Sequence, residues 1–185
     1  ELASARNFSL VAGGASILST AGSGPALATG YARIQAVSGL ALPSGFAILG
    51  YRPQGILVSE TSIPAALLIQ SGRAFAEFNE AVNTGVAIAN PNSEAVTISF
   101  YFSDSSGANA GQSSFTIPAN EQIAAFLNEA PFHLGAPLVG TLSFSSSLLV
   151  SAVVVRCFIN ERSEPLITTL PVVDIGGTET DARTL

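Results

Sequence analysis

The stretch Val96-Thr97-Ile98-Ser99-Phe100-Tyr101-Phe102-Ser103 decides the fold class of this chain. Every second residue is apolar, and the residues between them are small and polar or, at Tyr101, amphipathic. Because successive side chains of a β-strand point to opposite faces, this alternation predicts a strand with one buried and one exposed face. The stretch ends in Asp104-Ser105-Ser106-Gly107, whose Asp and Gly are typical turn residues.

Similar patterns recur along the chain, separated by turns rich in Gly, Pro, Asn and Ser. We expect at most one helical turn, around residues 127–130. The turn Asn90-Pro91-Asn92-Ser93 is expected to join residues 85–89 to the strand 96–103 as a hairpin. Further strands are expected at residues 8–18, 31–36, 46–51, 55–60, 66–70, 74–79, 113–117, 122–126, 140–145, 149–159 and 166–171.

Short strands with frequent turns predict an all-β fold, an antiparallel β-sandwich of the immunoglobulin-like or jelly-roll-like kind. The order Gly, strand, turn, apolar strand, turn, strand ending in Pro occurs at residues 30–64 and again at 140–171. This echo indicates two related β modules, with a single sandwich of similar hairpins as the alternative. The predicted division is an N-terminal segment at 1–29, a smaller β module at 30–75, a second β-sandwich module at 76–173 and a flexible tail at 174–185.

Composition and charge exclude several classes of protein. Of the 185 residues, 48% are hydrophobic and only 11% are charged, whereas soluble domains average about 25% charged residues. The net charge is −6, and every basic residue is an arginine. Without a basic patch the chain is not expected to bind nucleic acid or an anionic membrane surface, and its apolar content excludes disorder. No apolar run is long enough to span a membrane as a helix.

Residue types that carry catalysis or bind metals are sparse. One cysteine, Cys157, and one histidine, His133, exclude a typical zinc site, and Cys157 is expected to be a buried small hydrophobe. Asp104, or Glu161 with Glu164, offers oxygen ligands for calcium, but a solvated turn is the expected role of each. The chain holds no serine-hydrolase elbow and no nucleotide fingerprint. We therefore expect no enzyme, no catalytic or metal-binding residues and no cofactor.

Five segments of the second half carry a family resemblance. They are Asn83-Thr84-Gly85-Val86-Ala87-Ile88-Ala89-Asn90-Pro91-Asn92, Phe115-Thr116-Ile117-Pro118-Ala119-Asn120, Gly140-Thr141-Leu142-Ser143-Phe144, Val150-Ser151-Ala152-Val153-Val154-Val155-Arg156 and Ile167-Thr168-Thr169-Leu170-Pro171. Together they resemble a β-sandwich repeat module of large secreted bacterial surface proteins, notably from acidobacteria. The resemblance implies an extracellular, non-catalytic module and supplies no site residues.

The shortage of charge, and of lysine above all, favours a surface that meets other protein. Interface cores are depleted in lysine, and soluble monomers often protect open sheet edges with it. We therefore expect a structural subunit of a cell-surface filament or layer, assembled head to tail by β-strand contacts. The expected connector is a donor strand within residues 7–18. Its apolar residues are Phe8, Leu10, Val11, Ile17 and Leu18.

Two alternatives stay open. The connector is equally well explained as the first strand of the chain's own sheet. The whole chain is alternatively a carbohydrate-binding or protein-binding adhesion module of a larger secreted protein, for which Tyr31, Tyr51 and Tyr101 are the aromatic candidates. The sequence contains no methionine, so we expect an N-terminal signal peptide to have been removed and the protein to be extracellular or on the cell surface.

Overall fold

The computed structural model describes residues 5–20, 29–37 and 39–177, and over these residues the protein is all-β. One short 3-10 helix, η1 (Pro53–Gly55), follows the first strand. The strands are β1 (Phe46–Tyr51), β2 (Ser59–Pro64), β3 (Ile69–Phe78), β4 (Val82–Ala89), β5 (Val96–Asp104), β6 (Asn109–Ile117), β7 (Gln122–Phe126), β8 (Leu138–Ile159), β9 (Pro165–Leu170) and β10 (Val173–Asp174). No helix in these ranges is long and apolar enough to cross a membrane.

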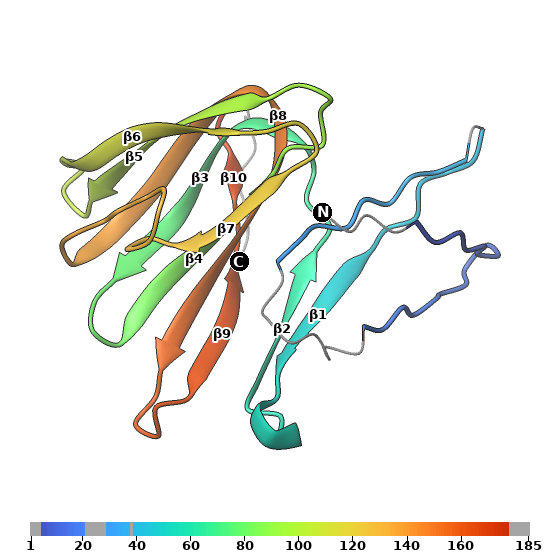
Figure 1. The fold of residues 1–185 in the computed structure, drawn as a ribbon, viewed down its shortest axis with the longest axis horizontal. Helices are drawn as coiled ribbons and strands as arrows, with labels where there is room; N and C mark the ends of the chain where they lie inside the picture. The colour runs from blue at the N-terminus through green and yellow to red at the C-terminus, as the bar shows by residue number, and fades with distance from the viewer. Residues whose placement is uncertain (1–4, 21–28, 38, 178–185) are drawn as a thin grey trace.

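The strand β8 gives the sandwich its two layers. Its residues 138–146 pair with β3 and β5, whereas its residues 151–159 pair with β4 and β9. The strand turns over between these parts and curls one antiparallel sheet onto itself (Figure 1). We call β10, β3, β8 residues 138–146, β5 and β6 the first half-sheet. The second half-sheet is β7, β4, β8 residues 151–159 and β9. The predicted antiparallel sandwich is confirmed.

The core lies between the two half-sheets and follows the alternation of β5. The four apolar residues predicted for one face of β5 are buried: Val96, Ile98, Phe100 and Phe102. The Phe100 ring packs edge to face on Phe132, with centroids 5.2 Å apart, and Phe132 packs in the same manner on Phe115 of β6. Such aromatic pairs add about 0.5–1.5 kcal/mol beyond the apolar area that they bury.

Several predicted strand boundaries are wrong because pairing partners, rather than local sequence, set them. Residues 66–70 and 74–79 were expected as two strands but contribute to the single strand β3, whose partner is β8. Residues 140–145 and 149–159 likewise belong to the one strand β8, despite the serines between them. The strand expected at 55–60 begins later, at Ser59, since η1 ends at Gly55 and the next three residues belong to no element. The bounds of β1 and β7 are as predicted.

The predicted hairpin between residues 85–89 and 96–103 is also wrong. β4 pairs with β7 and β8, whereas β5 pairs with β6 and β8, so the turn at Asn90 connects the two half-sheets instead of two neighbouring strands. The strands before and after this turn both direct buried side chains into the same core. The chain therefore crosses at this turn from one half-sheet to the half-sheet that faces it. Around residues 127–130 the chain forms hydrogen-bonded turns, including Glu129 N–H to the Phe126 carbonyl.

The strands expected at 8–18 and 31–36 do not form in the described parts of the chain. A strand needs a neighbouring backbone to pair with, and no strand of the described structure pairs with these residues. Within the first segment the chain turns instead, since Gly13 has φ 76° and the Gly14 N–H donates to the Val11 carbonyl. The alternative that this segment is the first strand of its own sheet is therefore wrong, and the donor-strand role stays a prediction.

The division of the chain into modules stays a prediction, although its boundary between residues 75 and 76 falls inside β3. Among described residues, the core cluster and the side chains packed on it lie between Ile69 and Val172. The expected tail begins in β10, where Asp174 pairs with Gly72 of β3. Residues 178–185 of that tail lie outside the described residues.

The hairpin β1–β2 packs beside β9 without extending its hydrogen-bond ladder (Figure 1). The Ile167 N–H donates to the Ser59 hydroxyl at 2.8 Å, and the Thr169 N–H donates to the Thr61 hydroxyl at 3.2 Å. The Thr169 hydroxyl donates to the carbonyl of Ser62. Side-chain hydroxyls of β2 thus satisfy backbone groups on the outer edge of β9, which protects that edge from other strands.

Replacing Ser59 by alanine together with Thr61 by valine should loosen this contact. The amide protons of Ile167 and Thr169 would lose their acceptors, so we expect their exchange with solvent to accelerate by about tenfold or more. Hydrogen exchange followed by NMR measures this directly. The matched control is Ser62→Ala, because only the backbone carbonyl of Ser62 takes part. Unchanged exchange at both amides in the double variant would contradict the assigned role of the hydroxyls.

Candidate functional site

The cysteine and the histidine lie on different parts of the described structure. Cys157 is buried on β8, and burial raises the pKa of its thiol, which disfavours the nucleophilic thiolate. His133 lies in the loop between β7 and β8 with φ 50°. Within the described ranges, no three His, Cys, Asp or Glu side chains are grouped so as to hold a metal ion.

The two loops considered for calcium use their carboxylates to hold turns. One oxygen of Asp104 accepts hydrogen bonds from the Ser106 hydroxyl and from the N–H groups of Ser106 and Ala108, and these bonds lower the pKa of Asp104. The Asn160 amide and, to a lesser degree, Arg162 lower the pKa of Glu164. An Asx-type turn explains the first loop fully.

The predicted connector residues are mostly exposed. Val11 is 80% exposed and Ile17 88% exposed, Phe8 and Leu18 are also exposed, and Leu10 is half-buried. The structure thus places these side chains on one segment, on both sides of the turn at Gly13, without bringing them together in a packed cluster. An arm of this kind leaves its backbone groups and its apolar side chains free for another chain.

Exposed apolar side chains continue from this segment through the hairpin β1–β2. All six residues of β1 are exposed, with Phe46 at 71% and Ile48 at 62%. Others with exposed large side chains are Tyr31, Ile34, Val37, Leu40, Leu42, Leu49, Tyr51, Ile56, Leu57, Leu67 and Leu68. We call the described residues up to 68 the N-terminal arm. Most of the exposed large hydrophobic side chains in the described structure belong to this arm.

The strand β6 forms an open edge of the first half-sheet. In the described chain it pairs with β5 alone, over residues 109–117. Its sequence, Asn-Ala-Gly-Gln-Ser-Ser-Phe-Thr-Ile, contains neither a charged residue nor a proline. Open edges usually carry such residues because an unguarded edge pairs with other strands. Among the described residues no strand covers the outer side of β6, whose register against β5 shifts near Gly111.

A polar cluster occupies the outer face of the first half-sheet. Arg73 of β3, Ser143 of β8, Tyr101 of β5 and Gln112 of β6 lie side by side in the strand register. The Arg73 guanidinium donates from Nε to the Ser143 hydroxyl at 2.8 Å and from Nη2 to the Tyr101 hydroxyl at 2.9 Å. Ser143 and Arg73 lower the pKa of Tyr101 through these polar contacts.

Sequence reasoning found only one member of this cluster. The alternation of β5 placed Tyr101 on the outer face, but Arg73 precedes it by 28 residues on a strand that does not pair with β5. The two side chains meet because β8 lies between their strands. No local sequence signal carries that information. The other two tyrosines, Tyr31 and Tyr51, lie on the N-terminal arm and are also exposed.

Comparison with protein-family models, with curated proteins and with solved structures finds no match. The resemblance to a secreted bacterial module therefore stays a prediction, and the argument for function rests on the surfaces described above.

Proposed function

We propose that this chain is a non-enzymatic structural subunit that joins copies of itself into an extracellular filament or layer through β-strand contacts. The observation that carries the proposal is the N-terminal arm, whose apolar side chains are mostly exposed and contribute nothing to the described core. Burying apolar surface stabilises by about 25 cal/mol per Å². A second copy that covers the arm therefore supplies a strong driving force for association.

The charge distribution favours a second copy as the occupant. Residues 1–68 carry three arginines and two glutamates, a net charge of +1. Residues 69–185 carry four arginines and eleven acidic residues, a net charge of −7. Contact between the arm of one copy and the sandwich of another therefore brings together surfaces of opposite sign, whereas contact between two sandwiches is repelled.

The open edge of β6 is the proposed acceptor for the arm. An extended segment adds to a sheet edge by backbone hydrogen bonds, and its alternate side chains then meet the neighbouring core residues; residues 8–18 would add in this way once the turn at Gly13 opens. At β6 those neighbours include Phe115, which packs against Phe100 and Phe132. The lysine-free composition agrees with an edge that is meant to be paired.

An arm and an edge are two different surfaces of one chain, so their contact is head-to-tail. Such a contact continues from copy to copy and forms an open filament unless the rotation between subunits closes a ring. We propose the extracellular location because the small-polar, sparsely charged composition suits a secreted assembly.

Replacing Phe46 and Ile48 by serine should weaken the assembly. Both side chains are exposed, so the folded subunit should lose little stability, while association loses apolar contacts. Sedimentation velocity over about a hundredfold range of concentration measures the effect. We expect the intact chain to form large species and the double variant to dissociate at concentrations at least about tenfold higher than those at which the intact chain dissociates.

The matched control is Val139→Ser with Leu149→Ser, two exposed apolar residues of β8 outside the arm. This control should assemble as the unaltered chain does. An intact chain that stays monomeric over the whole range would overturn the proposed function, and so would a control that dissociates as readily as the arm variant.

A further inference from the structure

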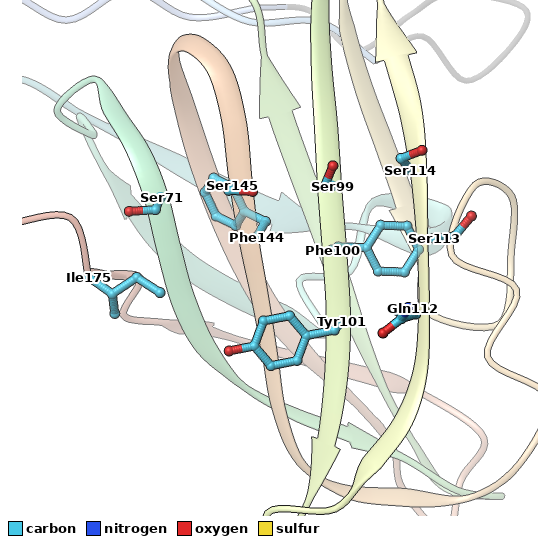
Figure 2. A pocket seen from close by; sticks show the side chains of 10 residues that line it. All are labelled: Ser71, Ser99, Phe100, Tyr101, Gln112, Ser113, Ser114, Phe144, Ser145 and Ile175. Atoms are coloured by element: carbon cyan, nitrogen blue, oxygen red, sulfur yellow. The ribbon is translucent and has the colours of Figure 1, made fainter.

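The outer face of the first half-sheet carries an ordered array of hydrogen-bonding side chains. Strand register aligns Ser71, Ser145, Ser99 and Ser114 in one row, beside the row that contains Tyr101. The two rows belong to β3, β8, β5 and β6. A shallow concavity of about 570 Å³ lies over them, and its lining includes all four serines together with Tyr101 and Gln112 (Figure 2).

Tyr101 lies across this concavity in a fixed position. The side chain of Tyr101 starts on β5, and its hydroxyl accepts a hydrogen bond from Arg73 on β3. The ring therefore lies across β8, which runs between those two strands. Figure 2 shows the ring face-on, turned toward the open side of the sheet. Arg73 is itself anchored by its second bond, to Ser143, which is buried. The aromatic face is thus pre-organised before any ligand arrives.

The lining of the concavity combines hydroxyl and amide side chains with the apolar Phe100, Phe144 and Ile175, and it carries no carboxylate. Serine hydroxyls both donate and accept, and the Gln112 side-chain amide does the same, so neighbouring hydroxyl groups of a ligand find partners of either kind. Arg73 adjoins the concavity through its bond to Tyr101, and it forms none of the ion pairs of the described chain. The remaining N–H groups of Arg73 can donate hydrogen bonds to a ligand. The net negative charge of the sandwich disfavours binding of a polyanion.

We propose that this face binds a neutral polysaccharide, with one sugar ring stacked on Tyr101 and its hydroxyls bonded to Arg73, Gln112 and the serine row. A pyranose presents C–H groups on its flat face and hydroxyls around its rim. An aromatic ring with polar neighbours matches both parts. Apart from side chains of β6, the proposed arm contact uses none of the residues of this site. Polysaccharide binding therefore does not depend on self-assembly.

Affinity electrophoresis of the full chain tests the site. Native gels would contain hydroxyethylcellulose, glycol chitin, xylan or glucomannan as neutral polymers, with polygalacturonate as the acidic one. We expect at least one neutral polymer to retard the chain. Tyr101→Ala should weaken that binding by about tenfold or more. Tyr101→Phe keeps the ring but loses the bond to Arg73, so an intermediate loss is expected.

The matched control is Ile159→Ala, which removes an exposed apolar side chain from the end of β8, outside both the arm and the concavity. It should leave binding unchanged, and thermal unfolding shows whether each variant is folded. The proposal is overturned if no neutral polymer retards the unaltered chain, if polygalacturonate alone does so, or if folded Tyr101→Ala binds as tightly as the control. Because the Tyr101 variants retain the arm, sedimentation separates this result from the test of assembly.

Discussion

Alanine in place of Asn90 is expected to lower the free energy of unfolding by about 4 kcal/mol, because it leaves several buried backbone groups without partners. The side chain is fully buried in the connection between the half-sheets. Its Nδ2 donates its two hydrogens among three carbonyls, those of Glu94, Ile117 and Pro118, which lie at 2.8, 3.1 and 2.9 Å, so one hydrogen is shared. Its Oδ1 accepts from the backbone N–H and the side-chain amide of Asn92.

This one side chain therefore holds together the turn after β4 and the end of β6. Denaturant unfolding measures the loss. Asn128→Ala is a suitable control, since Asn128 is exposed and its side chain accepts a single hydrogen bond, from Asn83. We expect the control to lose less than about 1 kcal/mol. Equal losses in the two variants would show that the buried network at Asn90 does not stabilise the sandwich as described.

Deletion of residues 1–20 is expected to abolish large assemblies while leaving the subunit folded. The described part of this segment contributes no strand to the sheet and no residue to the core, so the free energy of unfolding should change by less than about 0.5 kcal/mol. Light scattering and denaturant unfolding measure the two properties on the same sample.

A full-length variant separates loss of the apolar side chains from loss of chain length. Phe8, Val11, Ile17 and Leu18, all exposed, would be replaced by serine. The variant should behave as the deletion does. If the shortened chain forms the same assemblies as the intact one, residues 8–18 are not the connector, and contact through the hairpin β1–β2 alone would have to account for assembly.

The local sequence pattern predicted the fold class because apolar and polar residues alternate along the strands in the same way as buried and exposed positions do. β5 is the clearest case, and β1 and β7 begin and end where the sequence places them. The turn that contains Asn90 was also visible as a turn. What the pattern cannot supply is the strand on the other side of each turn, since that depends on packing between distant residues.

The errors follow from this limit. The strand β8 is continuous because β3 and β5 pair with one end and β4 and β9 pair with the other. The sequence near the serines of β8 gives no signal for this change of pairing partners. Residues 8–18 have the composition of a strand but no partner among the described residues. The meeting of Arg73 with Tyr101 likewise depends on β8 lying between their strands.

Disulfide trapping between two copies tests the contact between arm and β6 most directly. One copy would carry Leu10→Cys or, in a parallel experiment, Val11→Cys, because these two side chains point to opposite faces of an added strand, and the other a cysteine at Gln112, Ser114 or Thr116 on the outer face of β6, both with Cys157→Ala. We expect an intermolecular disulfide with at least one of the three positions, and none with the control Ser105→Cys in the exposed turn after β5. Absence of a bond at all three β6 positions, or equal bonding to the control, would contradict strand addition at this edge.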